Sequence, residues 1–199
     1  MNNAQARLRA GDLITTGIFT LLFFVVVFVF AMLFTTIPLM QPFIVCADAV
    51  FGGAIFLYLA TKVRKFGAVS IMSFIIGLVM CLAGHFWPCL IFGAVFGLLA
   101  DFLCSRGGYK KFAWNTAGYA AMMLGIALDG YSPMLFFEET FRQSRLDMGM
   151  SGEIIQQILD IIRGPMIIAA FAGAVICSVI GALIGKALLK KHFEKAGLL

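Results

Sequence analysis

Residues 85–111 read HFWPCLIFGAVFGLLADFLCSRGGYKK, and this stretch decides the fold class. Its apolar run, residues 86–104, is about as long as the roughly 20 mostly apolar residues that a helix needs to cross a bilayer. Gly93 and Gly97 lie four residues apart within the run, Asp101 is its single acid, and a basic turn follows at residues 105–111. The stretch therefore predicts a transmembrane helix whose two ends differ in charge.

The composition of the whole chain agrees with a membrane protein. Of its 199 residues, 62% are hydrophobic and 13% are charged, and the mean hydropathy of +1.01 is far above that of a soluble domain. The net charge of +5 does not indicate nucleic-acid binding, because the basic residues lie in short clusters between apolar runs. We expect membrane lipid around the chain and no nucleic-acid partner.

The cysteines and the first apolar run allow two further expectations. All five cysteines lie in apolar runs, without a CxxC or Cys/His spacing that suits zinc. They are therefore expected to pack as small apolar side chains, with no metal site. The run at residues 13–37 is too long for the apolar part of a cleavable signal, so it is expected to remain as the first membrane helix.

The apolar runs predict an all-α fold, a single transmembrane domain over residues 1–199. Six helices are expected, at residues 13–37, 43–60, 66–83, 86–104, 112–128 and 165–189. Lys and Arg in short loops favour the cytoplasmic side. They cluster in the amino-terminal tail, in the second and fourth connections and at the carboxyl end, leaving only Arg142, Arg145 and Arg163 elsewhere. Both termini are therefore expected to be cytoplasmic, with residues 129–164 outside.

The expected outer connection, residues 129–164, is longer than a plain connector and should carry structure. Ser151 can cap a helix, and Gly164 with Pro165 can end it. The helix would have one apolar stripe, formed by Ile154, Ile155, Ile158, Leu159 and Ile162. Two interpretations stay open: an interfacial helix that anchors the connection, and a lid over a ligand site.

Small residues on the last expected helix mark a surface for close helix contact. Four of them recur at every fourth position: Gly173, Cys177, Gly181 and Gly185. Membrane helices associate through such faces because small residues let two backbones approach closely. Contact with another helix of the same bundle and docking on a separate membrane subunit are the two interpretations, and we take the four residues as candidates for partner docking.

Charged residues inside apolar runs are candidates for function, because an unpaired charge in lipid is costly. Asp48 is the clearest candidate for substrate binding, with a structural hydrogen bond or ion pair as the alternative. Asp101 is expected to pair structurally with Arg106 or Ser105. At the outer surface, four residues are candidates for the mouth of the same site: His85, Trp87, Asp129 and Tyr131.

The order of several short motifs resembles the Trep_Strep family of bacterial membrane proteins. They are the opening DLITTGIFT at residues 12–20, the basic second connection, and GLLAD at residues 97–101 leading to GYK at residues 108–110. That family is similar to the substrate-binding S components of energy-coupling factor (ECF) transporters. The resemblance implies a multi-pass protein of the bacterial plasma membrane that captures a scarce nutrient from outside.

The resemblance also implies where the ligand binds and which partners act. The site would lie near the outer face under the first, third and fifth connections, which adds Glu138 and Arg142 to the candidates. The partners would be a transmembrane coupling protein and two ATPases. No cofactor is expected on this chain, which has no GxxxxGK[ST] loop, so ATP would be used by the partner ATPases.

The ligand implied by this resemblance is a small organic micronutrient such as a vitamin or a tetrapyrrole. Metal-binding members of the class begin with Met-His, whereas this chain begins Met1-Asn2-Asn3. Many S components dock through AxxxA on the first helix, a spacing that this helix lacks.

Two other functions remain as alternatives. A self-contained small channel or facilitator would explain the helix bundle equally well. An intramembrane enzyme is a remote alternative. The sequence EETFR at residues 138–142 is one residue shorter than the EExxxR motif of prenyl-protein proteases, and the HExxH and GxSxG motifs are absent. We therefore do not expect an enzyme.

Overall fold

The computed structural model describes residues 7–34, 37–83 and 85–195, and from residue 191 onward it describes the backbone alone. Within these ranges every regular element is a helix and none is a strand, so the predicted all-α fold is confirmed. The elements are α1 (Ala10–Phe34), the 3-10 helix η1 (Pro38–Phe43), α2 (Ile44–Val63), α3 (Ala68–Leu82), α4 (Pro88–Arg106), α5 (Phe112–Phe136), α6 (Glu138–Asp147), α7 (Gly152–Arg163) and α8 (Met166–Lys195).

Four helical segments of the described chain are long and apolar enough to cross a membrane. They are Ala10–Phe34, Leu39–Val63, Pro88–Arg106 and Met166–Lys190. The pair α5 and α6 passes the same test as one unit, although the two helices meet at a 97° bend, and α3 is shorter, at 15 residues. The structure thus supports four or five membrane-capable helices, and the arrangement of six spans stays a prediction.

The largest difference from the expected boundaries is in α5. It continues past Leu128, the expected end of the fifth span, for two further turns to Phe136. Pro133 lies inside these turns but does not end the helix, and the Phe137 amide still donates to the Pro133 carbonyl at 3.0 Å. Asp129 and Tyr131 therefore belong to a helix rather than to a loop. The first connection forms the 3-10 helix η1.

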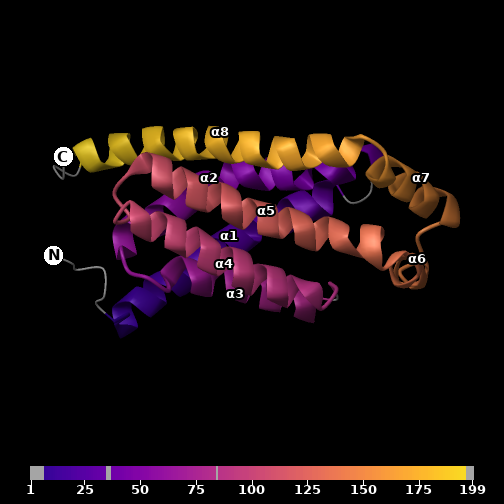
Figure 1. The fold of residues 1–199 in the computed structure, drawn as a ribbon, viewed down its shortest axis with the longest axis horizontal. Coiled ribbons are helices and arrows are strands. Elements are labelled where there is room, and N and C mark those ends of the chain that lie inside the picture. The colour runs from indigo at the N-terminus through magenta and orange to yellow at the C-terminus, as the bar shows by residue number, and fades with distance from the viewer. Residues whose placement is uncertain (1–6, 35–36, 84, 196–199) are drawn as a thin grey trace.

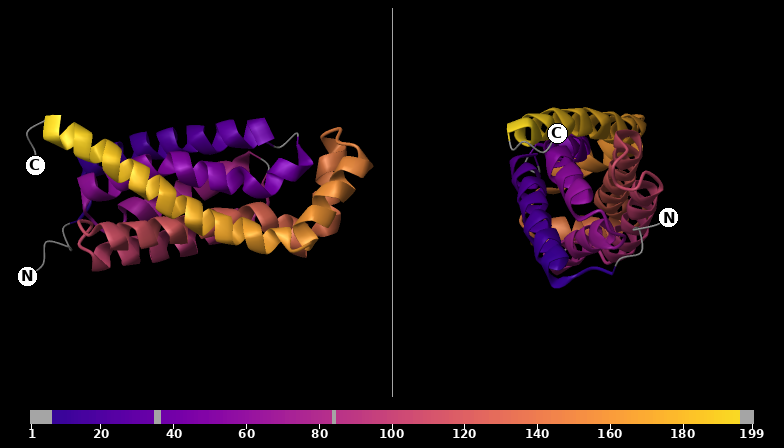
Figure 2. Two further views of the ribbon diagram at one scale, coloured as in Figure 1. Left: turned by 90° about the horizontal axis from the view of Figure 1, so that it is seen from above. Right: turned by 90° about the vertical axis from the view of Figure 1, so that its left-hand side faces the viewer.

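The helices form an elongated bundle with two different ends (Figure 1). The start of α1 and the end of α8 lie at one end, and α6 and α7 lie at the other (Figures 1 and 2). At the first end, Lys65 after α2 forms an ion pair with Asp12 at 2.6 Å, and the Lys186 ammonium lies 4.6 Å from the centre of the Phe112 ring. Basic residues therefore gather at the end of the bundle that holds the start of α1 and the end of α8. We call it the basic end.

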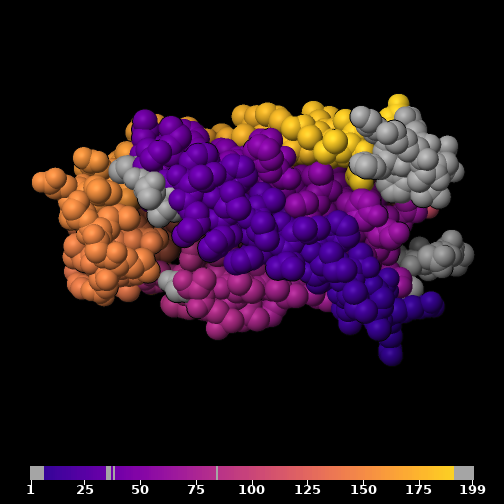
Figure 3. Space-filling model, turned by 180° about the vertical axis from the view of Figure 1, so that it is seen from behind, coloured from indigo at the N-terminus to yellow at the C-terminus, as the bar shows by residue number. Residues whose placement is uncertain are grey.

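Apolar side chains cover much of the outside of the bundle, as expected for contact with lipid. α1 crosses one face of the molecule (Figure 3). It exposes a long apolar surface that includes Leu13, Ile14, Ile18, Leu21, Val25, Met32 and Leu33. α1 buries only four of its residues, so most of this helix faces outward.

The row of small residues on α8 lies against α2. A Cβ atom added to Gly181 would overlap the Ala49 carbonyl oxygen, and one added to Gly185 would approach the Ala54 Cα to 2.8 Å. Gly173 likewise lies beside the Cys46 sulfur of α2. Within the described chain these contacts agree with the interpretation as contact inside the bundle. Partner docking through Gly173, Cys177, Gly181 and Gly185 stays a prediction.

Asp101 has the expected structural role but other partners. Its Oδ1 accepts a hydrogen bond from the Tyr109 hydroxyl at 2.6 Å. Its Oδ2 accepts from the amides of Gly67 and Ser70 at 2.7 and 3.0 Å, and from the Ser70 hydroxyl at 2.9 Å. The carboxylate of α4 therefore caps the first turn of α3, whereas Arg106 lies over the Phe102 ring instead.

The helix predicted after Ser151 is present as α7. The Ser151 hydroxyl accepts from the Ile154 amide at 3.4 Å, and the helix ends at Arg163, directly before Gly164. Four of the five predicted stripe residues are fully buried, namely Ile155, Ile158, Leu159 and Ile162. α7 packs with this stripe against η1, α5 and α8. It is thus fixed to the bundle on its apolar face.

Candidate functional site

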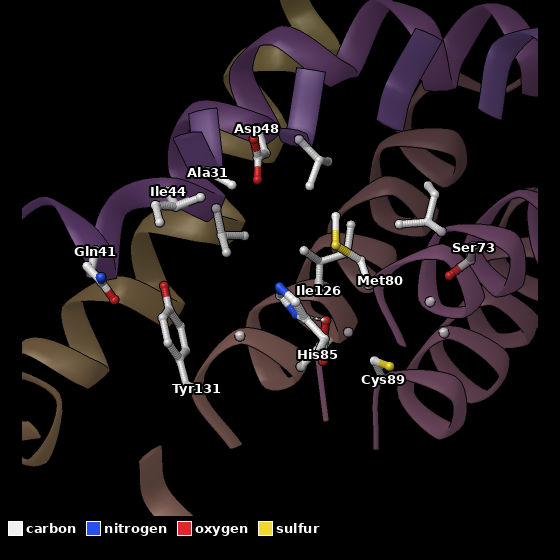
Figure 4. Close-up of a pocket in the computed structure, with 18 of the residues that line it drawn as sticks. Ala31, Gln41, Ile44, Asp48, Ser73, Met80, His85, Cys89, Ile126 and Tyr131 are labelled. Atoms are coloured by element: carbon white, nitrogen blue, oxygen red, sulfur yellow. Dashed lines mark ion pairs between the residues drawn. The ribbon is translucent and has the colours of Figure 1, made fainter. Parts of the chain in front are cut away.

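A cavity lies beneath α6. It is at the end of the bundle opposite the start of α1 and the end of α8. Its volume is about 130 Å³, and residues from α1 to α6 line it (Figure 4). The lining is mainly apolar, with Val27, Ile44, Val45, Ile76, Met80, Ile126 and Met134 among the side chains. A small set of polar residues interrupts it: Gln41, Asp48, Ser73, His85, Asp129, Tyr131 and Arg145. An apolar pocket with few convergent polar groups is typical of a small-molecule site.

Asp48 projects from the first turns of α2 into this cavity (Figure 4). Its side chain is 1% exposed, and neither carboxylate oxygen has a hydrogen-bond partner within the described chain. A buried carboxyl group without a partner is costly, so such groups are nearly always paired in proteins. The sequence-based choice of Asp48 as a residue facing the interior is confirmed by its position; its binding role remains a prediction.

His85 and Asp129 meet at the wall opposite Asp48. The His85 Nδ1 lies 3.5 Å from the Asp129 Oδ2. The backbone of His85 is held by its amide, which donates to the Met80 carbonyl at 3.0 Å. The other oxygen of Asp129 is buried and has no partner among the described residues. The pair thus connects the α3–α4 connection with α5 at the cavity.

Tyr131 closes another side of the cavity. Its hydroxyl donates to the Pro42 carbonyl of η1 at 2.6 Å, and its ring packs edge-on against Phe171 of α8, with 5.4 Å between ring centres. Phe137 at the bend between α5 and α6 stacks on Phe86, with 5.8 Å between ring centres. Residues of the first, third and fifth connections therefore line one cavity, and ligand binding there stays a prediction.

Arg145 is the charged cavity residue that was not selected from the sequence; Gln41 and Ser73 also line the cavity and were not predicted. Arg145 projects from α6, lines the cavity and lies with its guanidinium 5.1 Å from the centre of the Phe141 ring. Burial lowers the pKa of Arg145, because desolvation disfavours its charged form. No carboxylate forms an ion pair with it in the described part of the chain. Only the fold of α6 distinguishes it from Arg142, three residues earlier.

Three predicted site residues do not line this cavity. Trp87 is 58% exposed and lies edge-on to Phe137 at 6.3 Å between ring centres. Arg142 donates to Glu138 at 3.1 Å and to Gln156 at 2.8 Å, and Glu138 also pairs with Arg163. Glu138 and Arg142 therefore connect α6 with α7 above the cavity. Across the described ranges, no three His, Cys, Asp or Glu side chains are grouped to hold a metal ion.

A helical bundle with an apolar exterior and several helices long enough to cross a bilayer defines an α-helical integral membrane protein. The comparison with protein families gives the same class and names the family. The chain belongs to the Trep_Strep family, described as hypothetical bacterial integral membrane proteins, whose model matches residues 10–195. Searches among curated proteins and among solved structures gave no match.

Proposed function

We propose that this protein is the substrate-binding membrane subunit, or S component, of an ECF-type ABC importer. It would capture a small organic micronutrient in the cavity beneath α6 and deliver it through a shared module of a transmembrane coupling protein and two ATPases. The observation that carries the proposal is the buried carboxyl group of Asp48, which has no hydrogen-bond partner among the residues that the structure describes and which lines a largely apolar cavity.

The interior between the cavity and the basic end supports a receptor rather than a channel. Tyr119 is fully buried next to Asp48, and its hydroxyl donates to the Ala49 carbonyl at 2.8 Å. The rings of Phe23 and Phe56, both fully buried, lie 6.5 and 4.9 Å from the Tyr119 ring centre. A continuous pore would need these aromatic side chains to move, whereas a receptor needs a site closed on this side.

The partner proposal also follows from what this chain lacks. Its sequence has no phosphate-binding loop, so uphill transport driven by ATP would need ATPases from elsewhere. With the small residues of α8 already packed on α2, the outward faces of the other membrane helices are the surfaces left for the coupling protein. The extensive apolar surface of α1 can contact both lipid and a membrane partner.

The experiment is a purification of the tagged full chain from its native membrane in mild detergent, followed by mass spectrometry of proteins and small molecules. We expect two ATPases and one transmembrane protein to be recovered with the chain. A matched sample carrying Gly181→Val, which should disrupt the α2–α8 contact, controls for nonspecific recovery. Recovery of the chain without any ATPase, together with solute flux through vesicles that contain this chain alone, would replace the importer with a facilitator.

A further inference from the structure

We infer that the ligand of this cavity is a small dipolar molecule about the size of one ring. Its positively charged nitrogen would bind the Asp48 carboxylate, and its anionic or acceptor group would face Arg145. This inference rests on the proposed function, because it names the ligand class of the same site.

The first step concerns Asp48. Both of its oxygens are buried and unpartnered within the described chain, in a cavity wall formed mainly by Val45, Ile76 and Met80. No basic side chain of the described residues forms an ion pair with this carboxylate, so we expect a ligand to supply the positive or donating group that it needs. An ammonium or protonated ring nitrogen meets that need and also forms the stronger, charge-assisted hydrogen bond.

The second step is to ask which other polar groups of the cavity still need a partner. The Tyr131 hydroxyl is used by Pro42, and His85 with one oxygen of Asp129 forms a pair of its own. Asp48 has no hydrogen-bond partner among the described residues, and the Arg145 guanidinium donates to the Met148 sulfur at 3.6 Å but pairs with no carboxylate there. Asp48 and Arg145 carry opposite charges and line the same cavity, yet they form no ion pair with each other. The cavity therefore presents one negative and one positive group to the same ligand.

The third step concerns size. A cavity of about 130 Å³ is close to the engineered cavity of about 150 Å³ that holds benzene. One ring with short substituents fits this volume, and a tetrapyrrole would require α6 to move away. Apolar residues of the lining, such as Met80 and Ile126, suit the faces of such a ring (Figure 4).

The test uses four matched probes built on one benzene ring: 4-(aminomethyl)benzoate, benzylamine, benzyl alcohol and benzoate. Binding is measured as the shift in thermal unfolding of the purified full chain in detergent at neutral pH. We expect the zwitterion 4-(aminomethyl)benzoate to bind best and benzylamine next. Benzyl alcohol should bind at least about tenfold more weakly than benzylamine, because a charge-assisted hydrogen bond is lost. Benzoate should bind no better than the alcohol.

Two variants assign the two ends of the ligand. Asp48→Asn should remove the advantage of benzylamine over benzyl alcohol, and Asp48→Glu should retain part of it. Arg145→Gln should remove only the advantage of the zwitterion over benzylamine. Arg142→Gln, three residues away and outside the cavity, is the matched control and should change neither ratio.

The inference is overturned if benzylamine binds no better than benzyl alcohol to the unmodified protein, including the case in which neither binds. It is also overturned if Asp48→Asn folds and keeps the advantage of the amine. These results are independent of the purification experiment. If ATPases are recovered but benzylamine has no advantage over benzyl alcohol, the importer proposal stands and this ligand class is rejected. If benzylamine has the advantage but no ATPase is recovered, the ligand class stands and the importer proposal is rejected.

Discussion

The buried carboxylate of Asp101 provides the sharpest test of how the bundle is held together. We predict that Asp101→Ala destabilises the protein by about 4 kcal/mol. The side chain is fully buried and accepts four hydrogen bonds, one from Tyr109 and three from the start of α3. At a net value of about 1 kcal/mol for each bond, their loss gives this figure. It also agrees with the cost of leaving buried donors without a partner.

Two milder variants test how much of this free energy of unfolding comes from the charge of Asp101 and how much from its hydrogen bond with Tyr109. Asp101→Asn can direct its oxygen toward the amides of Gly67 and Ser70 and its amino group toward the Tyr109 oxygen, which can accept. It should therefore cost only about 1 to 2 kcal/mol, the difference between charge-assisted and neutral hydrogen bonds. Tyr109→Phe removes one bond and should cost about 1 kcal/mol.

The assay is reversible unfolding in mixed micelles titrated with a denaturing detergent. Asp160→Ala is the control, because that carboxylate lies exposed on α7 and should change the free energy of unfolding by at most about 0.5 kcal/mol. A double-mutant cycle of Asp101→Ala with Tyr109→Phe should show a coupling of about 1 kcal/mol. The reasoning is refuted if Asp101→Ala costs no more than Asp160→Ala.

Three further predictions concern single contacts. Gly181→Ala should destabilise by about 1 to 3 kcal/mol, since its Cβ overlaps the Ala49 carbonyl and the backbones must separate, whereas Gly17→Ala, which meets no atom within 4 Å, should not. Ser151→Ala should cost about 1 kcal/mol and speed hydrogen exchange in the first turn of α7, and Ser151→Asp should restore protection. Burial and the Asp101 hydrogen bond raise the pKa of Tyr109, so its phenol should stay protonated above about pH 10, where free tyrosine ionises. Ultraviolet titration up to about pH 11 should then show no difference between the native protein and Tyr109→Phe, and an extra ionising phenol in the native protein would contradict this.

Most helices could be predicted from the sequence because apolar runs of membrane length leave little choice of structure. The boundaries that failed are those where the chain leaves the apolar pattern. Asp129 ends the apolar run of α5, yet the helix continues because its carbonyls still find amide donors beyond Pro133. The partners of Asp101 could not be predicted either. Reach along one helix suggested Arg106, whereas packing of α3 on α4 supplied backbone donors that no sequence pattern shows.

The candidate site likewise contains residues that the sequence could identify and residues that it could not. Asp48 could be identified because the cost of a charge in an apolar run is a property of the sequence alone. Arg145 could not, because Arg142 and Arg145 lie in the same polar segment and differ only in what surrounds them. Arg142 pairs with Glu138 and Gln156, and the bend after Phe136 directs Arg145 into the cavity. Tertiary contacts between α6 and α7 therefore select the arginine that reaches the site.

The two ends of the bundle are held by different interactions, and this difference bears on how a ligand would enter. At the basic end, Asp101 joins α3 and α4 through buried hydrogen bonds, which are costly to break. At the cavity end, α6 is joined to α7 by the ion pair of Glu138 with Arg163 and by the hydrogen bond from Arg142 to Gln156, and these side chains are partly exposed to solvent. Exposed ion pairs contribute at most about 1 kcal/mol each. By this comparison, separating α6 from α7 costs less than separating α3 from α4, so we expect a ligand to enter at the cavity end while the basic end keeps its structure.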